Sequence, residues 1–516
     1  MSTKTAMASS LSLVNALAKA HAGKIVETHI SWVLLTGHYV YKIKKPVNFG
    51  FLDFSTLEKR RFCCHEELRL NRRLAAELYL EVVPITGAPE HPQLGGDGVA
   101  IEYAVKMLQV PAGQLLGEYA RRGRLGEDEI DQLADLVAGF HQTIARTDAN
   151  SPYGDSAGIN HWFVENFQHI KPLLVDESRK QQLQLIQDWG DNEWRKQAGL
   201  MQLRRLQGQV RECHGDLHLG NMTLVNGKVT PFDCIEFNPM LRWVDVLSEV
   251  AFLFIDLLYF GYERYAYRFL NRYLQHTGDY QGLPLLRYYL VYRALVRAKV
   301  ALLRMTQQDG DAAKQARCEY AAFADLAERF TKSRETVLII THGYSGSGKS
   351  TMAAQLAETI GAFQIRSDIE RKRLFGYQAL AQTGSGIADG LYSQEAGLKT
   401  YRRLNELAGA VLAAGFPVIV DAAFLETGQR ELFLQLAADC AAPFRIMAFE
   451  APDEELQRRI EQRRNDVSEA TADVLRHQQQ SAQPLSEQEQ ACAVTINTAS
   501  GNALENMLNN FDRYRQ

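Results

Sequence analysis

The chain has 516 residues, of which 46% are hydrophobic and 23% are charged, and its formal net charge is −4. This length exceeds what one hydrophobic core supports, so at least two domains are expected. The small net charge argues against a long polyanion bound along a basic face, and no stretch reaches the roughly 18–20 uncharged apolar residues of a membrane span. Seven cysteines without a C-x-x-C spacing argue against a disulfide framework or a zinc site. We therefore expect a cytoplasmic protein without a membrane partner.

The N-terminal residues predict a helix, three strands and a second helix. Residues 1–23 are rich in Ser and Ala and contain no acid, which also fits a transit peptide. The helical spacing of their apolar residues favours an ordinary amphipathic helix. Three short strands are predicted at residues 26–30, 32–36 and 39–43. The helix that follows them carries Glu66 and Glu67.

Lys42 lies in the third of these strands, in the sequence Val-Tyr-Lys-Ile. Alternation along a strand places this lysine on one face of the sheet. Kinases use a strand lysine paired with a helical glutamate to orient the α- and β-phosphates of ATP. We predict that Lys42 is this lysine and that Glu67 is its partner, with Glu66 as the competing choice.

A strand at residues 101–108 ends the predicted small lobe, which covers about residues 25–108. Residues 113–332 are mainly helical in pattern and form the predicted large lobe. His141 lies on the apolar stripe of a helix at 127–145 and is interpreted as a core histidine whose hydrogen bonds are satisfied.

The large lobe contains a phosphoryl-transfer signature, His-Gly-Asp216-Leu-His-Leu-Gly-Asn221, followed by a short strand and Asp233. A kinase needs one carboxylate that accepts or orients the substrate hydroxyl, and an amide oxygen and a second carboxylate that hold Mg²⁺. Asp216, Asn221 and Asp233 supply this set in the expected order. Glu249 and Asp256 follow on a helical pattern, and with Asp216 they favour a cationic or polyhydroxylated acceptor.

A second nucleotide site is predicted where an apolar strand at 337–340 leads into Gly343-Tyr-Ser-Gly-Ser-Gly-Lys349-Ser350. The spacing is G-x-x-x-x-G-K-S, in which backbone N–H groups surround phosphate oxygens, the lysine neutralises charge and the serine hydroxyl ligates Mg²⁺. The predicted ATP-binding residues of this loop are Gly343, Ser345, Gly346, Ser347, Gly348, Lys349, Ser350 and Thr351. Ser350 is also a predicted metal ligand.

Strands and helices alternate after this loop, which predicts a parallel sheet with ligands at the carboxyl ends of its strands. Asp368 and Asp421 each lie at such an end, and Asp368 is expected on the strand next to the loop's own strand. A second interpretation of Asp368 is a cap of the helix that begins at Ile369. Arg459 and Arg463 belong to a basic helix that is either a solvated face or a lid over the transferred phosphoryl group.

With these residues in hand, the first part of the chain, residues 1–332, resembles the aminoglycoside/choline phosphotransferase family of kinase-like enzymes. The second part, residues 336–516, resembles the small P-loop kinases that include gluconate kinase, chloramphenicol phosphotransferase and zeta toxins. The resemblance implies an α+β two-lobed kinase-like fold followed by an α/β parallel-sheet fold, with ATP and Mg²⁺ as cofactors. It implies that Asp216 and Asp368 are catalytic, that Lys42 contacts phosphate, and that Asn221, Asp233 and Asp421 belong to metal sites.

Three functions stay open. The first is a kinase that phosphorylates hydroxyl groups of small molecules at two sites. The second is a nucleic-acid 5′-hydroxyl kinase in the P-loop domain, although a nucleic-acid partner is not favoured by the charge. The third is a regulatory ATP-binding protein with one inactive domain. Neither the acceptors nor the oligomeric state follow from the sequence, because acceptor pockets are built from scattered loop residues.

Overall fold

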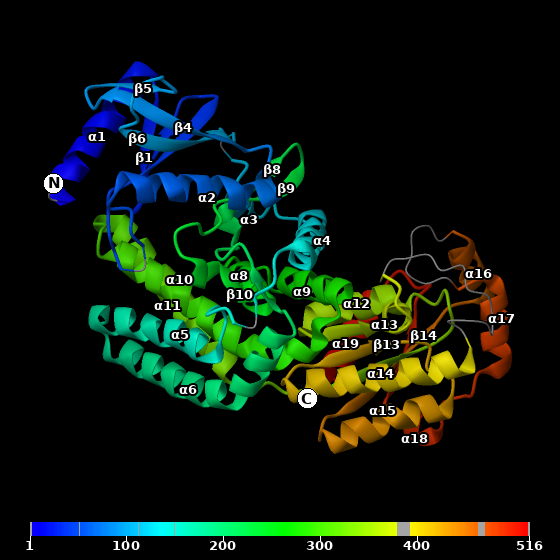
Figure 1. Cartoon of the computed structure of the whole chain (residues 1–516). Helices are drawn as coiled ribbons and strands as arrows, with labels where there is room; N and C mark the ends of the chain where they lie inside the picture. The colour runs from blue at the N-terminus through cyan, green and yellow to red at the C-terminus, as the bar shows by residue number, and fades with distance from the viewer. Residues whose placement is uncertain are drawn as a thin grey trace. The chain divides into compact units, whose positions relative to one another are not determined.

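The computed structural model (Figure 1) describes residues 3–50, 52–111, 113–148, 150–378, 393–462 and 470–513. By their packing, these residues form two compact units, each described here by itself. The first unit comprises Met1–Gln132, Gly139–Trp162 and Met201–Asp256. The second comprises Leu133–Ala138, Phe163–Leu200 and Leu257–Gln516. The predicted domain boundary at 332–336 falls inside the second unit. None of the described helices is both long and apolar enough to cross a membrane.

The first unit is built on a six-stranded antiparallel sheet with the order β1-β2-β3-β6-β4-β5. Its strands are β1 (Lys24–Glu27), β2 (Ser31–Leu35), β3 (Tyr39–Lys44), β4 (Tyr79–Ala88), β5 (His91–Leu94) and β6 (Glu102–Leu108). The strands predicted from the alternating pattern lie within about two residues of β1, β2, β3 and β6.

Two helices cover the two faces of this sheet, α1 (Thr3–Ala20) and α2 (Leu57–Ala75). Successive side chains of a strand point to opposite faces, so Ile43 of β3 packs in one apolar cluster with Leu13 and Leu17 of α1. Lys42 and Lys44 therefore face the other side, where α2 lies. The amphipathic N-terminal helix predicted from the sequence is confirmed.

The rest of the first unit carries residues 214–221, the predicted catalytic loop, between short strands. These elements are α3 (Leu116–Arg121), β7 (Val210–Glu212), η2 (Leu219–Asn221), β8 (Met222–Val225), β9 (Lys228–Pro231), α7 (Pro239–Arg242) and β10 (Trp243–Asp245). β7 pairs with β10, and β8 with β9, both antiparallel. Four helices contribute residues to both units: α4 (Glu127–Thr143), α5 (Ser156–Ile170), α6 (Glu177–Leu206) and α8 (Val246–Tyr259).

The second unit contains a helical part and a five-stranded parallel sheet. The helical part has η1 (Lys171–Leu173), α9 (Glu263–Thr277), η3 (Asp279–Leu285), α10 (Leu286–Met305) and α11 (Gly310–Thr331). The sheet strands are β11 (Leu338–His342), β12 (Phe363–Arg366), β13 (Val418–Asp421), β14 (Phe444–Glu450) and β15 (Ala493–Asn497). Their order is β12-β13-β11-β14-β15, and every neighbouring pair is parallel.

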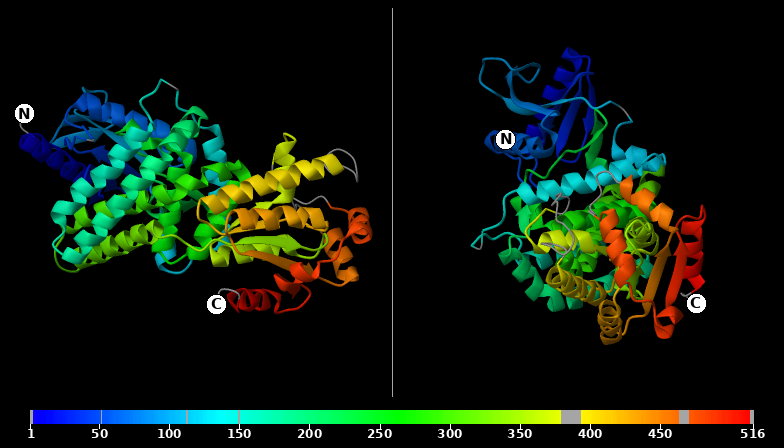
Figure 2. Two further views of the ribbon diagram at one scale, coloured as in Figure 1. Left: turned by 90° about the horizontal axis from the view of Figure 1, so that it is seen from below. Right: turned by 90° about the vertical axis from the view of Figure 1, so that its right-hand side faces the viewer.

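Helices cover both faces of the parallel sheet, which is why its strands read as continuous apolar runs (Figure 2). The helices are α12 (Lys349–Ile360), α13 (Ser367–Leu374), α14 (Gln394–Ala413), α15 (Thr427–Asp439), α16 (Asp453–Glu461), α17 (Ala472–Ser481), α18 (Glu487–Ala491) and α19 (Ala503–Arg513). Ile339 and Ile419 pack with Leu356 of α12 and Met507 of α19 in one core. The predicted α+β part and α/β parallel sheet are both confirmed.

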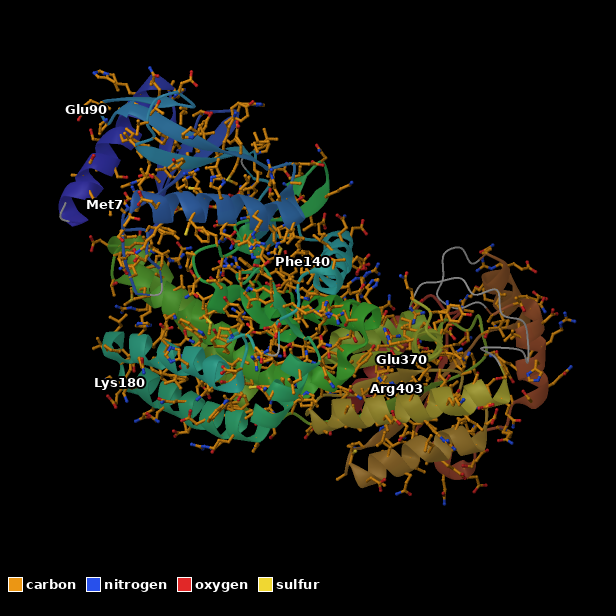
Figure 3. All side chains as sticks on the ribbon, viewed as in Figure 1. Met7, Glu90, Phe140, Lys180, Glu370 and Arg403 are labelled. Atoms are coloured by element: carbon orange, nitrogen blue, oxygen red, sulfur yellow. The ribbon has the colours of Figure 1, made fainter. Side chains whose placement is uncertain are left out.

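Buried charge ties α13 to α14 in this unit. Glu370 is 1% exposed, pairs with Arg373 of its own helix, and lies 3.9 Å from Nε of Arg403 on α14. Figure 3 labels Glu370 and Arg403 on the two helices. This contact joins α14 to the helix that follows β12 and carries Asp368.

Candidate active sites

A lysine and glutamate cluster lies between β3 and α2 in the first unit. Lys42 Nζ is 2.8 Å from Oε1 of Glu67, and Lys42 also pairs with Asp233. Lys44, which is fully buried, pairs with the second carboxylate oxygen of Glu67 and with Glu236. Glu67 therefore bridges two lysines, and the structure brings together the predicted pair Lys42 and Glu67.

Glu66, the competing partner, lies on another face of α2. It pairs with Arg69 at 2.8 Å and with Arg242 at 3.4 Å. Of the two neighbouring acids, only Glu67 contacts Lys42 among the described residues.

The charges within the cluster favour the ionised forms of Lys42 and Glu67. Burial by itself lowers the pKa of Lys42, but the carboxylates of Asp233 and Glu67 outweigh it and raise this pKa well above the ordinary value. Burial likewise raises the pKa of Glu67, but Lys42 and Lys44 bring it below the ordinary value. The carboxylates keep the lysine protonated, and a protonated lysine at this position can neutralise the negative charge of a phosphate group.

The catalytic loop places Asp216 among hydrogen-bond donors. Asn221 Nδ2 donates to Oδ2 of Asp216 at 2.8 Å, and His218 Nε2 lies 3.4 Å from the same oxygen. His218 Nδ1 accepts from the backbone N–H of Gly220, so Nε2 is the atom that carries the proton. The Asp216 side chain is 35% exposed and so remains accessible to an acceptor hydroxyl.

Two buried acids of α8 hold this loop through its backbone. Glu249 accepts from the N–H groups of His214 at 3.1 Å and Gly215 at 2.6 Å, and Asp256 accepts from the N–H of Leu219 at 2.9 Å. Glu249 and Asp256 are buried and bound to the loop itself, so they do not supply the charge that was expected, with Asp216, to favour a cationic or polyhydroxylated acceptor. Gly215 has φ +89°, and a Cβ there would lie 2.9 Å from Leu241 O, so glycine is required.

His141 contacts Glu249 from α4. Its Nε2 lies 2.8 Å from Glu249 Oε2, and the ring is 2% exposed. The interpretation of His141 as a satisfied core histidine is therefore confirmed.

The hairpin of β8 and β9 brings the two predicted metal ligands together. Asn221 precedes β8 and Asp233 follows β9, and Phe232 N donates to Asn221 O at 2.9 Å. Asp233 has φ +63°, a left-handed conformation that a non-glycine residue adopts at a cost of about 1–3 kcal/mol. Its N–H donates to the Tyr79 hydroxyl at 3.1 Å, which helps to hold this conformation.

These oxygens suit a magnesium ion. Mg²⁺ prefers carboxylate and amide oxygens. Asp233 is 42% exposed, and because Asn221 Nδ2 donates to Asp216, its Oδ1 is the amide atom left for a metal. The chemistry of this donor set therefore fits the ion that the sequence implies.

The P-loop of the second unit runs from β11 into α12 with three glycines at positive φ. Gly343, Gly346 and Gly348 have φ of +142°, +85° and +82°. A Cβ on Gly343 would lie 2.4 Å from Phe449 O, and one on Gly346 would lie 2.6 Å from Leu456 O. The glycines are therefore required by the path of the backbone, and Lys349 Nζ folds back to Tyr344 O at 2.7 Å.

Asp421 lies beside this loop at the end of β13, the strand that pairs directly with β11. The prediction that the strand before Asp368 lies next to the P-loop strand is wrong, because β13 lies between β12 and β11. Asp421 is hydrogen-bonded to Ser350, and burial raises its pKa although Arg366 opposes the shift. A serine hydroxyl and a carboxylate at this position suit Mg²⁺.

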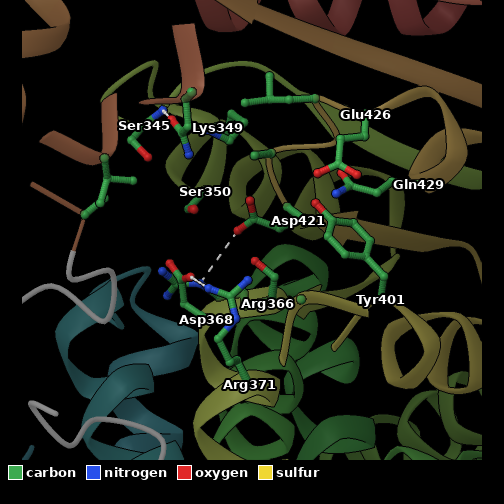
Figure 4. Close-up of a pocket in the computed structure, with 18 of the residues that line it drawn as sticks. Ser345, Lys349, Ser350, Arg366, Asp368, Arg371, Tyr401, Asp421, Glu426 and Gln429 are labelled. Carbon is green, nitrogen blue, oxygen red and sulfur yellow. Dashed lines mark hydrogen bonds and ion pairs between the residues drawn. The ribbon is translucent and has the colours of Figure 1, made fainter. Parts of the chain in front are cut away.

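Asp368 lies in the first turn of α13 and does not cap it. The helix begins at Ser367, its N-cap residue is Arg366, and no side chain makes the cap hydrogen bond. The Asp368 carboxylate is 26% exposed and lies 3.9 Å from Nη1 of Arg371 (Figure 4). The capping interpretation is therefore wrong.

A cavity of about 970 Å³ joins these groups at the carboxyl ends of the strands. Figure 4 shows Lys349, Ser350 and Asp421 on one side of it, with Asp368 and Arg371 across from them. Most predicted residues of the P-loop line it, together with Asp368, Asp421 and Arg459. The loop residues concerned are Ser345, Gly346, Gly348, Lys349, Ser350 and Thr351.

Two predicted loop residues do not line the cavity, and one of the two predicted lid arginines lies against the P-loop backbone. Gly343 and Ser347 do not line the cavity among the described residues, and Ser347 is buried. Arg459 of α16 donates to Gly346 O at 3.4 Å and to the Thr498 hydroxyl at 2.8 Å, so its guanidinium lies against the P-loop backbone. Arg463 lies outside the described residues.

Three residues that position the sites were not predicted from the sequence, namely Lys44, Glu236 and Gln364. Lys44 and Glu236 complete the lysine cluster, and the D-x-x-E spacing from Asp233 to Glu236 was the available signal. Glu249 was noticed but given the wrong role. Gln364, whose Nε2 donates to Asp421 at 3.0 Å, belongs to no sequence motif that could have identified it.

The fold and the two sites define a chain that joins a kinase-like α+β part to a P-loop α/β domain. Residues 338–485 match a family model described as an AAA domain. A protein of Mycobacterium tuberculosis (strain ATCC 25618 / H37Rv), described as uncharacterized, is 29% identical over 448 residues, which cover 87% of this chain and 88% of the relative. A Mycobacterium bovis protein with the same description matches with the same figures.

Two solved structures are each similar to a part of this chain. A sugar kinase from Janibacter sp. HTCC2649 is 22% identical with a TM-score of 0.28, and the match covers 34% of this chain and 95% of that one. A choline kinase from Cryptosporidium parvum Iowa II is 10% identical with a TM-score of 0.36, covering 60% of this chain and 89% of that one.

Proposed function

We propose that this protein is an ATP- and Mg²⁺-dependent phosphotransferase with two nucleotide sites that phosphorylates hydroxyl groups of small molecules. The observation that carries the proposal is that each unit combines the same three kinds of group. Each has a lysine for phosphate charge, hard oxygen ligands for a divalent cation, and a further carboxylate accessible to an acceptor. Phosphoryl transfer requires this combination, because catalysis rests on positioning and on neutralising charge.

In the first unit, Lys42 binds phosphate oxygens and Glu67 keeps it in place. Asn221 and Asp233 hold the metal, and bound Mg²⁺ supplies positive charge to the phosphate oxygens. Asp216 orients the acceptor hydroxyl and takes up its proton at the carboxylate, which Asn221 and His218 keep in position. Because the loop backbone is bound by Glu249 and Asp256, the carboxylate stays in place as the acceptor binds.

In the second unit, the P-loop N–H groups and Lys349 bind the phosphates, and Ser350 and Asp421 hold the metal. Asp368 lines the same cavity and is the proposed partner of the acceptor hydroxyl. Arg459, fixed against Gly346 O, adds positive charge beside the loop.

The charges that line this cavity favour an acceptor that carries an anionic group. Arg366, Arg371 and Arg402 line the cavity, together with the acids Asp368 and Glu426. Arginine binds carboxylate and phosphate through two parallel N–H groups. An alcohol that also bears a carboxylate or phosphate therefore suits the cavity better than a neutral sugar.

The proposal is tested by measuring ATP consumption of the full-length protein with panels of alcohols. The panels are anionic alcohols, neutral sugars, amino alcohols and an oligonucleotide with a free 5′-hydroxyl, each repeated with Asp216→Asn and Lys349→Ala. We expect anionic alcohols to raise turnover in a manner that depends on Lys349. Turnover only with the oligonucleotide would support the 5′-hydroxyl kinase, and nucleotide binding without turnover on any panel would support the regulatory protein.

A further inference from the structure

The edge strand β12 is bound on one side by the helical part of the second unit. Among the described residues, β13 is the one strand with which β12 pairs. On its other side, Asn271 of α9 accepts from Gln364 N at 2.7 Å through Oδ1 and donates to Ala362 O at 3.0 Å through Nδ2. Tyr280 of η3 donates its hydroxyl to Gln364 O at 3.2 Å. These side chains satisfy the backbone groups that a neighbouring strand would otherwise pair.

The side chain of the same residue, Gln364, reaches the metal end of the P-loop site. Its Nε2 donates to Asp421 Oδ2 at 3.0 Å and to Ser350 O at 3.2 Å. Its Oε1 lies 3.4 Å from Nε2 of Gln275 on α9. Gln364 is 2% exposed, so these contacts are shielded from water.

The hydrogen bond from Gln364 orients the carboxylate of Asp421. Arg366 Nε is 3.7 Å from the same oxygen, Oδ2, that Gln364 binds. Without the amide donor, the carboxylate is free to turn toward the arginine and away from Ser350. Groups that hydrogen-bond a metal-binding carboxylate typically change metal affinity by 10–100-fold when they are lost.

We propose that Gln364 is a positioning residue for Asp421, and that the helical segment α9–η3 sets its position through Asn271, Gln275 and Tyr280. The Mg²⁺ concentration that the P-loop site requires then depends on side chains of α9–η3, a segment that lies outside the predicted P-loop domain. This inference rests on the proposed nucleotide site at Lys349.

The same interface supplies a matched control. Arg264 and Arg268 of α9 pair with the buried Glu358 of α12 at 3.2 and 3.1 Å. Neither pair contacts Gln364 among the described residues. Arg264→Ala therefore weakens the interface without touching the chain of contacts that leads to Asp421.

The test measures binding of a non-hydrolysable ATP analogue to the full-length protein by calorimetry at a series of Mg²⁺ concentrations. Binding of the analogue at the P-loop site is the part of the total binding that Lys349→Ala abolishes. We expect Gln364→Leu and Asn271→Leu to raise the Mg²⁺ concentration for half-maximal affinity about tenfold, while affinity without Mg²⁺ stays at the wild-type value. Arg264→Ala should match the wild type.

Gln275→Ala keeps the test decisive if either leucine variant fails to fold, because it removes only the 3.4 Å contact at a half-buried position. It should shift the Mg²⁺ requirement in the same direction by about two- to threefold. An unchanged Mg²⁺ requirement in the folded variants, or an equal loss of affinity with and without Mg²⁺, would overturn the assignment of Gln364. Absence of any Lys349-dependent binding in the wild type would instead remove the proposed nucleotide site, and with it this inference.

Discussion

Four aspartates carry the proposed chemistry, and their surroundings distinguish their roles. Asp216 is bound by an amide and an imidazole donor, whereas Asp233 contacts the lysine that is proposed to bind phosphate. Asp421 is buried beside Ser350, whereas Asp368 is partly exposed across the cavity. In each unit, one carboxylate thus lies with the cation-binding groups and the other is accessible to an acceptor.

Changing Asp216 to Asn should lower phosphoryl transfer by the first unit by about two to four orders of magnitude, because the variant cannot take up a proton. Nucleotide affinity should stay nearly unchanged. Asp233→Ala should instead weaken Mg²⁺-dependent nucleotide binding, because it removes a metal ligand. Steady-state turnover and calorimetric affinity, measured for both variants with Lys349→Ala in the background, separate the two roles. Equal loss of nucleotide binding in both variants would contradict them.

Changing Asp368 to Asn should abolish acceptor-dependent turnover by the P-loop site and leave the melting temperature and ATP affinity unchanged. The side chain does not cap α13, so the substitution removes a proton acceptor without changing the helix cap, and it weakens a partly exposed 3.9 Å pair with Arg371 that contributes little to stability. The measurement is made in an Asp216→Asn background, in which only the P-loop site turns over. Turnover of the double variant equal to that of Asp216→Asn alone would assign Asp368 no catalytic role.

At the scale of elements, the features that depend on periodicity and local spacing could be predicted from the sequence. The strand around Lys42 alternates, so its faces were predictable, and the P-loop was identified from glycine spacing between a strand and a helix. The position of β12 was not predictable, because strand order depends on packing between elements far apart in the chain. Glu249 was misassigned for the same reason, since a buried acid on a helix looks the same in sequence whether it binds a ligand or a backbone.

Glu249 anchors the catalytic loop to α8, and this anchor should be visible in the pH dependence of stability. Burial raises its pKa, but the hydrogen bond and charge of His141 outweigh burial and lower it to about 2 from the ordinary 4.5. A carboxyl whose folded-state pKa is depressed stabilises fully above its unfolded-state pKa and loses that contribution as pH falls toward 2. Glu249→Gln should therefore cost about 2 kcal/mol near pH 7, because an amide cannot accept from every donor that surrounds it.

Urea unfolding of wild type and Glu249→Gln from pH 8 to pH 3 checks this expectation. The difference in free energy of unfolding between the two proteins should stay constant down to about pH 4.5 and decrease below this pH. Glu177→Gln, at a side chain that is 73% exposed, is the matched control and should leave stability unchanged. A difference that grows as pH falls would contradict the assignment.

At the scale of the whole molecule, the chain carries two separate sets of groups of the same kind. The set in the first unit is built between an antiparallel sheet and a helix, with a hairpin that brings the two proposed metal ligands together. The set in the second is built at the carboxyl ends of parallel strands, where α/β sheets bind their ligands. Because the two constructions share no residue, each is expected to bind nucleotide independently.

The chain should accordingly bind two molecules of a non-hydrolysable ATP analogue in the presence of Mg²⁺. Lys349→Ala removes the phosphate-binding lysine of the P-loop and should reduce the stoichiometry to one, and Lys42→Ala should do the same by removing the lysine that Glu67 and Asp233 hold. The double variant should bind none, which calorimetric titration of all four proteins would show. Lys45→Ala is the control for a nearby lysine, because Lys45 pairs with Glu27 and not with Glu67. A wild-type stoichiometry of one that Lys349→Ala abolishes would mean that only the P-loop site binds nucleotide and that the first unit is not an ATP-dependent enzyme.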